Sequence, residues 1–441
     1  MNVLLVGSGA REHAIAKILC AQTSAMQLNC FAATHNPGIK KLAANFLVGN
    51  INNVHEVVEF ARQHPVEFAI IGPEAPLEHG LADALWRLGV PVIGPKQKLA
   101  QIETSKSFAR DLMKKYQIPG APRYQVFQDI KGVEEFLRDL GEEGYVIKAN
   151  GLMGGKGVKV AGEHLHSFDE ALDFCRQVQA SNQIFVIEEK LIGQEFSLMG
   201  FCDGKQVFIM PCVQDHKRAF QGDRGPNTGG MGSYSDANHL LPFLSAQDVE
   251  AARQINQQVM LALQNEFDEK YIGILYGSFI ATRNGIAVIE FNARFGDPEA
   301  MNVLSILESN FADLCRAMIN NSLTTNLVRF APMATVCKYV VPEGYPDNGL
   351  KNAALDISAV KNPSQLYLAS VNEQEGQLFT AGSRAVAVVG VAKTITEAEV
   401  LAEAEVMRIR GRVFHREDIG TSALIQQRIE QMRMLRAGSE L

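Results

Sequence analysis

The 441-residue sequence predicts an α/β protein of several domains. Short apolar segments alternate with helical patterns over residues 1–102, two glycine-rich loops interrupt the middle of the chain, and short strands and turns begin at Pro332. Alternating strands and helices are typical of a parallel sheet with helices on both faces. We expect an N-terminal α/β domain at 1–102, a second domain at 103–328 with a subdomain at about 122–190, and a C-terminal mixed α+β domain at 329–441.

Composition and charge exclude several classes of protein. The net charge is −7 and 46% of the residues are hydrophobic, which fits a globular core and leaves no basic excess for nucleic acid. The seven cysteines are scattered without a CxxC pair, so reduced thiols are favoured over disulfides or zinc. The first residues lack a signal-peptide pattern, and no apolar run reaches the roughly 18 residues of a membrane helix. We therefore expect a cytoplasmic protein that binds neither nucleic acid nor a membrane.

Two turns in the N-terminal domain are candidate ligand sites. Apolar strands are expected at 3–6, 68–71 and 90–93. Ligands of parallel sheets bind beyond the carboxyl ends of the strands, where Gly7-Ser8-Gly9 and Gly72-Pro73-Glu74 follow the first two. The first turn opens a helix and suits an anion, although plain strand–helix packing also explains its glycines.

The glycine-rich loop at 148–157 is the first strong signal in the second domain. Glycines let the backbone approach phosphates, and Lys148 and Lys156 add positive charge. The spacing matches neither a Walker A loop nor a dinucleotide fingerprint, and a flexible hairpin is the alternative. Farther on, the segment 188–191 follows an apolar strand and offers backbone groups to an adenine edge, while Glu195 suits ribose hydroxyls. A solvated acidic edge is the alternative for that segment.

The segment 215–218 combines charged residues with the glycine-dense loop 225–232. Ordered loops of this composition usually bind a ligand. Arg218 suits bidentate binding of a carboxylate or phosphate, and His216 is either a ligand-binding or a buried structural histidine.

The segment 289–299 is the most informative part of the chain. Alternate side chains of a strand share a face, so Glu290 and Asn292 are expected to point the same way, with Arg294 after them. Asp297 and Glu299 follow in a turn. Hard oxygen ligands beside a guanidinium suit a magnesium ion that carries nucleotide phosphates. A strand with a polar edge is the alternative.

These segments, in this order, resemble the ATP-grasp ligases and, among them, the phosphoribosylamine–glycine ligase family. The matching segments are GSGAREHA (7–14), GPEAPL (72–77), SKSF (105–108), KANGLMGGKGV (148–158), DHKR (215–218), GPNTGGMG (225–232), EFNARFGDPE (290–299) and REDIG (416–420). The similarity runs from about residue 2 to 425. It implies a multidomain ATP-grasp ligase in which ATP lies between two sheets, beneath a mobile lid.

The resemblance also implies roles for individual residues. The implied ATP-binding residues are Lys106, Lys148, Gly154, Gly155, Lys156, Gly157, Glu188, Glu189, Lys190, Leu191 and Glu195. The implied metal ligands, for Mg2+ or Mn2+, are Glu290 and Asn292. Candidate catalytic residues are Arg294, which would stabilise the transferring phosphoryl group, and Asp215, Lys217 and Arg218, which would orient the substrates. Candidate substrate-binding residues are Gly7, Gly9, Gly72, Pro73, Glu74, Asn227, Thr228, Gly229 and Asp297.

The implied reaction joins glycine to 5-phosphoribosylamine at the expense of ATP, through glycyl phosphate, and belongs to de novo purine biosynthesis. A monomer or weak homodimer is expected. The sequence departs from the usual family pattern, mostly in loops expected around the acceptor, at Ala10, Arg110, Asn150, Met153-Gly154, Phe196 and the stretch 380–384. These departures motivate an alternative, a diverged ligase for another amino acid or amine. A non-catalytic nucleotide-binding regulator is a further alternative, and Glu290, Asn292, Lys148 and Arg294 argue against it.

Overall fold

The computed structural model describes residues 1–23, 25–152 and 157–438. The N-terminal domain is a five-stranded parallel sheet in the order β3-β2-β1-β4-β5. Its strands are β1 (Asn2–Val6), β2 (Gln27–Ala32), β3 (Asn45–Val48), β4 (Phe68–Ile71) and β5 (Val92–Ile93). Its helices are α1 (Ala10–Gln22), α2 (Pro37–Leu42), α3 (Val54–Gln63), α4 (Ala75–Glu78) and α5 (Leu81–Arg87). The predicted α/β fold class is confirmed, because the apolar runs of β1 and β4 are buried in a parallel sheet.

Two helices lead out of this domain, α6 (Gln97–Thr104) and α7 (Lys106–Lys115). Ser105 separates them because its backbone is extended, and its hydroxyl accepts a hydrogen bond from the Phe108 N–H at 3.3 Å. Lys106 is therefore the first residue of α7.

The smaller subdomain is an antiparallel sheet in the order β6-β9-β7-β8, and we call it the lid sheet. It contains β6 (Tyr124–Phe127), β7 (Tyr145–Ala149), β8 (Val158–Val160) and β9 (Phe185–Glu189), with α8 (Val133–Leu140) and α9 (Phe168–Ala180). Phe127 stacks on Phe185 with ring centroids 5.6 Å apart, inside a separate hydrophobic cluster. The lid sheet thus has a core of its own.

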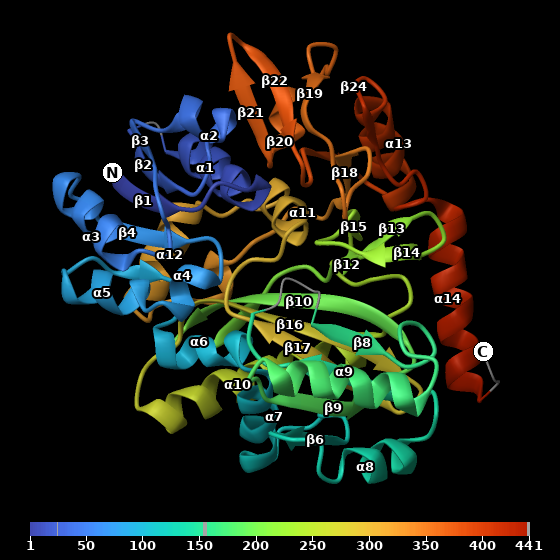
Figure 1. Cartoon of the computed structure of the whole chain (residues 1–441). Helices are drawn as coiled ribbons and strands as arrows, with labels where there is room; N and C mark the ends of the chain where they lie inside the picture. The colour runs from blue at the N-terminus through green and yellow to red at the C-terminus, as the bar shows by residue number, and fades with distance from the viewer. Residues whose placement is uncertain (24, 153–156, 439–441) are drawn as a thin grey trace.

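Opposite the lid sheet lies a second antiparallel sheet in the order β11-β10-β16-β17 (Figure 1). It contains β10 (Gln194–Asp203), β11 (Val207–Ile209), β16 (Ile272–Thr282) and β17 (Gly285–Asn292). The helices α10 (Ala246–Phe267) and α12 (Phe311–Ile319) pack on this sheet, whereas α11 (Glu299–Ser305) lies between α1 and the C-terminal sheet. β17 carries the polar segment that the sequence singled out.

The C-terminal sheet draws strands from both sides of residue 328. Its order is β12-β15-β18-β23-β20, with β25 paired to β18. These strands are β12 (Gln214–Asp215), β15 (Gly232–Ser235), β18 (Ala334–Pro342), β20 (Leu366–Leu368), β23 (Val386–Ala392) and β25 (Val413–Phe414). β12 and β15 belong to the segment assigned to the second domain, so its loops lie directly against the C-terminal part of the chain.

The remaining C-terminal elements form a smaller sheet and two helices. The sheet has the order β21-β22-β19-β24. Its strands are β19 (Lys351–Asp356), β21 (Val371–Gln374), β22 (Gln377–Ala381) and β24 (Arg410–Gly411), and the helices are α13 (Ile395–Val406) and α14 (Ser422–Ala437). A separate hairpin pairs β13 (Arg218–Phe220) with β14 (Arg224–Asn227). The short 3-10 helices η1 (Thr325–Leu327) and η2 (Pro363–Gln365) complete the described elements.

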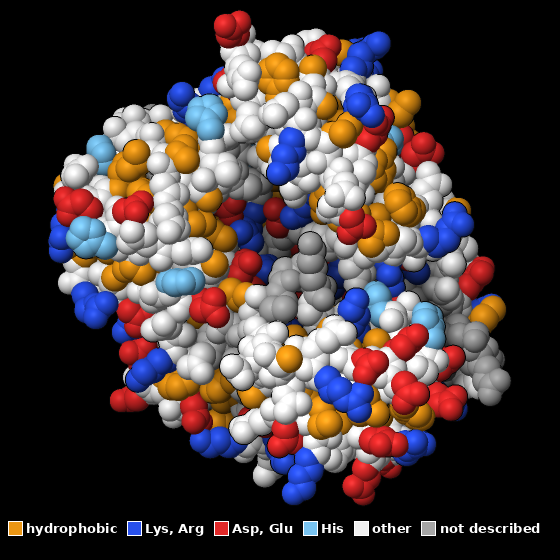
Figure 2. All heavy atoms as spheres, viewed as in Figure 1, with side chains coloured by type: hydrophobic (Ala, Val, Ile, Leu, Met, Phe, Trp, Pro, Cys, Tyr) orange, Lys and Arg blue, Asp and Glu red, His pale blue; other side chains and the backbone are white. Residues whose placement is uncertain are grey.

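A hollow lies where the N-terminal domain, the lid sheet and the C-terminal sheet meet. Figure 2 shows basic and acidic side chains gathered inside it, framed by mostly uncharged surface. Within the described residues, no helix is long and apolar enough to span a membrane.

Candidate active site

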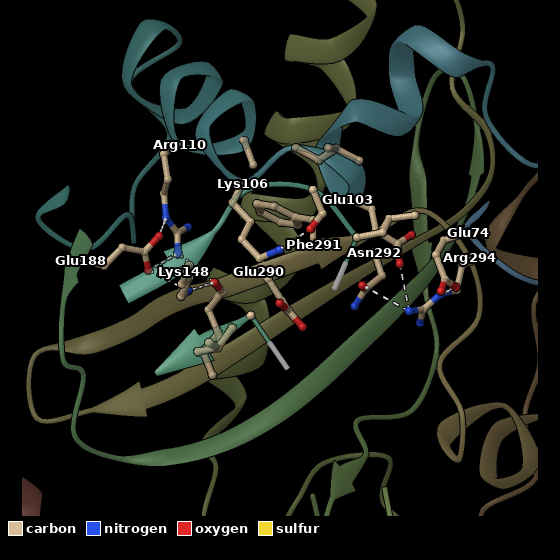
Figure 3. Close-up of a pocket in the computed structure, with 17 residues that line it drawn as sticks. Glu74, Glu103, Lys106, Arg110, Lys148, Glu188, Glu290, Phe291, Asn292 and Arg294 are labelled. Atoms are coloured by element: carbon tan, nitrogen blue, oxygen red, sulfur yellow. Dashed lines mark hydrogen bonds and ion pairs between the residues drawn. The ribbon is translucent and has the colours of Figure 1, made fainter. Parts of the chain in front are cut away.

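A cavity of about 170 Å3 opens between α7, the lid sheet and β17. Its lining combines apolar side chains with a high density of charge (Figure 3). The charged and amide residues around it are Glu74, Glu103, Lys106, Arg110, Lys148, Glu188, Glu290, Asn292 and Arg294. Seven of these nine were predicted as site residues from the sequence, and Glu103 and Arg110 were not.

Glu290 and Asn292 lie on β17 and both line the cavity. Ser278 of β16 is opposite Glu290, whereas Phe279 is opposite Val288, so Ile289 is an extra residue in the strand. Such a β-bulge redirects neighbouring groups and is common beside active sites. Burial opposes ionisation of Glu290, but nearby cations, Lys217 first, outweigh it and lower its pKa.

These two side chains fit a hard divalent cation that also binds phosphates. A carboxylate and an amide oxygen are ligands that magnesium accepts, usually with phosphate oxygens and water. No cluster of three or more His, Cys, Asp or Glu side chains suited to a metal occurs in the described ranges. The two side chains therefore supply only part of a coordination shell. The phosphates of a bound nucleotide and water would supply the rest.

Two lysines converge on the same cavity from different elements. Lys148 of β7 donates to the Ile289 carbonyl at 3.0 Å and lies 2.7 Å from the Glu188 carboxylate. Lys106 donates to the Gly151 carbonyl at 2.8 Å, which joins the start of α7 to the glycine-rich loop. Burial and the Lys148 charge lower the pKa of Lys106, against the opposite effect of Glu290. Gly157 also lines the cavity, whereas Gly154, Gly155 and Lys156 lie outside the described residues.

The segment 188–191 divides into parts with different environments. The Glu188 side chain is 3% exposed and ion-paired, and its pKa is lowered to about 2 because Arg110 and Lys148 outweigh its burial. The N–H groups of Glu189 and Lys190 donate to the Arg123 and Gly144 carbonyls at 2.9 and 2.8 Å. These two amides are therefore committed to the lid sheet.

Leu191 differs from its neighbours. Among the described residues, its N–H has no hydrogen-bond acceptor. Within the segment 188–191, Leu191 is the residue whose N–H has no acceptor among the described residues and could bind a ligand.

A second charged cluster lies beside β12. The Lys217 ammonium is 3.5 Å from Glu195 and 3.9 Å from Asp215. Burial raises the pKa of Asp215 to about 7, with Glu299 and Glu195 adding to the effect and Lys217 opposing it. Asp215 and the other acidic neighbours in turn raise the pKa of Lys217. Glu195, assigned to a ribose from the sequence, thus contacts the Lys217 side chain.

Arg294 is surrounded by carboxylates. Its guanidinium lies 3.3 Å from Glu74 and 2.9 Å from Glu103, and it donates weakly to Asn292 at 3.4 Å. Burial raises the pKa of Glu103 to about 7 against the effect of Arg294. Glu103 also accepts a hydrogen bond from the Ala293 N–H at 2.7 Å. The positive charge of Arg294 is therefore balanced by residues from the N-terminal side of the cleft.

The glycine turns of the N-terminal domain surround a buried carboxylate, Glu12. Glu12 accepts a hydrogen bond from the Gly9 N–H at 2.6 Å. A Cβ atom on Gly72 would lie 2.1 Å from a Glu12 oxygen, and one on Gly7 would lie 2.7 Å from Cγ of Glu12 and 2.9 Å from Pro73. Close packing against Glu12 therefore accounts for these glycines. The Glu12 carboxylate itself lies in the turn that the sequence suggested for an anion.

The glycine-dense loop 225–232 meets the C-terminal domain at Arg384. This side chain donates to the Gly229 carbonyl at 2.7 Å and lies 3.2 Å from the Asp297 carboxylate. Asp297 also accepts a hydrogen bond from the Tyr339 hydroxyl at 2.6 Å. Thr228 turns back on the loop, because its hydroxyl donates to the Lys217 carbonyl at 2.7 Å. Sequence analysis noted Arg384 only within the stretch 380–384 and did not select Tyr339. Both residues meet Asp297 through the tertiary fold.

Arg218 points away from the cavity. Its guanidinium pairs with Glu163 of the lid subdomain and donates to the Gly225 carbonyl at 2.9 Å. Asn227 lies opposite Arg218 in the β13–β14 hairpin and is exposed. The REDIG segment explains the position of this hairpin, because the buried Arg416 side chain binds Asp223 at 2.8 Å and also donates to the Arg218 carbonyl.

Two sheets that enclose a cleft, with lysines from α7 and the lid sheet and oxygen-bearing side chains on β17, define an ATP-grasp ligase. Family profiles match three parts of the chain: the phosphoribosylglycinamide synthetase N domain at 1–103, its ATP-grasp domain at 104–300 and its C domain at 335–422. The chain therefore belongs to the phosphoribosylglycinamide synthetase family, also called phosphoribosylamine–glycine ligases.

Relatives support this membership along the whole chain. The phosphoribosylamine–glycine ligase of Methanosarcina barkeri is 48% identical over 99% of this chain and 100% of its own length. That of Methanocaldococcus jannaschii is 46% identical with the same coverage. The crystal structure of the Thermotoga maritima enzyme has a TM-score of 0.81 at 26% identity, covering 95% of this chain and 100% of its own. An ADP complex of N5-carboxyaminoimidazole ribonucleotide synthetase shares the fold, with a TM-score of 0.63 at 16% identity.

Proposed function

We propose that this protein ligates glycine to 5-phosphoribosylamine and consumes ATP. The products are glycinamide ribonucleotide, ADP and phosphate, as in de novo purine biosynthesis. The observation that carries the proposal is the full-length relation to enzymes of this name, at 44–48% identity, together with an intact nucleotide cleft. We place the reaction in the cytoplasm and expect a monomer or weak homodimer.

The reaction takes two steps that need positioning and neutralisation of charge more than a protein nucleophile. A glycine carboxylate oxygen attacks the γ-phosphorus of ATP, the bond to the β,γ-bridging oxygen breaks, and ADP leaves. The amine of phosphoribosylamine then attacks the carbonyl carbon of glycyl phosphate. The carbon–oxygen bond to phosphate breaks, phosphate leaves with the electron pair, and the amine loses a proton.

The described residues divide these tasks between two sides of the cleft. Lys106 and Lys148, which line the cavity, bind phosphate oxygens. Leu191 is not among the residues that line the cavity, and its N–H, which has no acceptor among the described residues, is the candidate for the adenine edge. The acyl phosphate must be kept from water during the second step. Glu290 and Asn292 would hold a divalent metal, which we propose to be magnesium because the ligands are hard oxygens and few. When bound, such a metal neutralises charge on the transferring phosphoryl group.

Asp215 and Lys217 serve the acceptor side. Lys217 lies between Asp215 and Glu195 and is positioned to orient the glycine carboxylate. A carboxyl group with a pKa of about 7 is suited to accept the amine proton at neutral pH, and Asp215 has that value. Arg294, Asp297 and the loop containing Gly229 remain candidates for contacts to the phosphoribosyl group.

Three of the departures from the family pattern, at Phe196, Asn150 and Arg110, lie away from the proposed acceptor residues. Phe196 is buried against Phe279 in the core. Asn150 accepts a hydrogen bond from the Ser107 N–H at 3.1 Å and so supports the start of α7. Arg110 lies in the nucleotide cleft. The stretch 380–384 does lie beside the proposed acceptor residues, because Arg384 contacts Gly229 and Asp297, and Met153 and Gly154 lie outside the described residues. A diverged ligase for another amino acid or amine therefore stays the second candidate.

The test is phosphate release by purified protein with ATP, magnesium and freshly generated 5-phosphoribosylamine, across the amino acids one at a time. Release with glycine alone, together with glycinamide ribonucleotide in the mass spectrum, supports the proposal. Release with another amino acid but not glycine would overturn the substrate and keep the ligase chemistry. Exchange of magnesium for manganese in the same assay tests the metal.

A further inference from the structure

Arg110 is a buried cation that joins three structural units at the nucleotide cleft. It lies on α7 one turn after Lys106 and is 2% exposed. Its Nε and Nη2 atoms donate to the two Glu188 carboxylate oxygens at 2.6 and 2.9 Å. Nη2 also donates to the carbonyls of Val288 and Ile289 at 3.1 and 2.8 Å. One side chain thus connects α7, the lid sheet and β17 (Figure 3).

The contact with β17 falls at the bulge. A bulge interrupts the ladder, and a buried carbonyl that loses its strand partner needs another donor. Arg110 is one such donor for Ile289, the residue directly before the proposed metal ligand Glu290, and Lys148 is a second donor to the same carbonyl. The planar guanidinium can serve a carboxylate and carbonyls together, which a lysine ammonium cannot do in the same geometry.

The contact with Glu188 is shared with a second cation. Lys148 lies 2.7 Å from the Glu188 oxygen that Arg110 also binds, and all three side chains are at most 7% exposed. One carboxylate therefore balances two cations in a buried site. Lys148 is the member of this triad that a phosphate group would recruit.

We propose that Arg110 is a positioning residue for the nucleotide, which keeps Glu188 paired when Lys148 transfers to an ATP phosphate. The inference rests on the proposed function, in which Lys148 binds phosphate. A buried carboxylate that loses its charged partner is strongly destabilised. With Arg110 present, Glu188 retains two hydrogen bonds after Lys148 leaves. Without Arg110, the phosphate competes with Glu188 for the same ammonium group.

The direct test is Arg110→Met, with ADP binding measured by calorimetry in the presence of magnesium. We expect the affinity to fall by about 10- to 100-fold, as for loss of a residue that supports a ligand-binding side chain. KM for ATP should rise correspondingly, and kcat at saturating ATP should fall much less. Arg110→Lys keeps the charge without the fork and should give an intermediate affinity.

A second substitution separates this role from general support of the fold. In Arg110→Met/Glu188→Gln no carboxylate competes for Lys148, so ADP affinity should recover towards that of the wild type. A merely structural role of Arg110 predicts that the double variant binds as weakly as Arg110→Met, or more weakly. Lys115→Met is the matched control, since Lys115 lies on the same helix in an exposed pair with Glu266 and should leave binding unchanged.

A pH titration gives an independent readout. Glu188 faces Arg110 from α7 and Lys148 from β7, with Lys106 and Tyr124 also close enough to interact. In Arg110→Met, ADP should bind more tightly as the pH falls, because a protonated Glu188 no longer holds Lys148. The wild type should show no such trend, since its Glu188 pKa is lowered to about 2.

The outcomes distinguish this inference from the proposed function. If Lys148→Met binds ADP as tightly as the wild type, the assignment of Lys148 to phosphate fails. If Lys148→Met loses affinity but Arg110→Met does not, the role of Arg110 is overturned and the nucleotide site stands. Failure of the double variant to recover affinity also overturns it.

Discussion

The two sides of the cleft are built in different ways. The proposed nucleotide side uses residues from regular elements that face one cavity, namely Lys106, Lys148, Glu290 and Asn292. The proposed acceptor side takes Asp215 from the end of β12, Lys217 and Asp297 from loops, and Arg384 from the C-terminal domain. On the first side, the position of a residue in its strand or helix determines where its side chain points. On the second side, the packing of distant segments brings the residues together. Variants of the two sides should therefore separate nucleotide binding from use of the acceptor.

The largest effect is expected for Glu290→Ala on the nucleotide side. Loss of a metal ligand removes several kcal/mol of charge stabilisation, so turnover should fall by about 100-fold or more. The fold should persist, because Glu290 faces the cavity and does not support the core. Steady-state phosphate release and a thermal melt check both statements. Glu250→Ala, in an exposed helical pair, is the control, and wild-type turnover in Glu290→Ala would refute the metal assignment.

Lys217→Met probes the acceptor side. We expect kcat/KM for the amine to fall on the order of a hundredfold, because substrate orientation and proton transfer are both disturbed. ADP affinity should change little, which is the opposite pattern to Arg110→Met.

The pH profile of this variant sharpens the comparison. Asp215 has a pKa of about 7, and Lys217 lowers it. If the ionised carboxylate accepts the amine proton, activity rises with pH through about 7 in the wild type. Removal of the Lys217 ammonium raises the pKa of Asp215 further. The rise of activity with pH should therefore occur at higher pH in Lys217→Met. If activity rises over the same pH range in Lys217→Met as in the wild type, Asp215 is not the titrating group.

The nucleotide side was also the more predictable one. Alternation along a strand placed Glu290 and Asn292 together, and glycine spacing marked the loop after Lys148. Glu103 carried no local signal, and Arg384 was noted only as part of the stretch 380–384, because each gains its contacts from a partner about 80 to 190 residues away. The fold class followed from strand and helix periodicity, whereas β12 and β15 joined the C-terminal sheet through pairing that periodicity does not encode.

Arg384→Ala tests whether the C-terminal domain serves the acceptor. Its guanidinium holds Gly229 and Asp297, so its loss should loosen the glycine-dense loop. We expect KM for 5-phosphoribosylamine to rise about tenfold, the effect of one charge-assisted hydrogen-bond partner, with KM for ATP unchanged. Arg412→Ala is the matched control, since Arg412 forms an exposed pair with Glu343 in the same domain. An equal rise in both KM values would place Arg384 in general support of the fold.

The smallest effect is expected for Arg218→Ala, which breaks the one described ion pair between the lid subdomain and the β13–β14 hairpin. Both partners are partly exposed, so the pair contributes little to the free energy of unfolding. The expected change is about two- to fivefold in the rate of ATP hydrolysis with glycine and without amine. Arg218 lies next to Lys217 in the chain, and its partner Glu163 belongs to the lid subdomain, so the pair links lid position to the acceptor loop. Its loss should raise ATP hydrolysis with glycine in the absence of amine, because glycyl phosphate meets water more often.

Glu163→Ala should reproduce the effect, and the double variant should add nothing further. Additive effects of the two substitutions would show that the residues act separately, and would leave the two sides of the cleft uncoupled at this point.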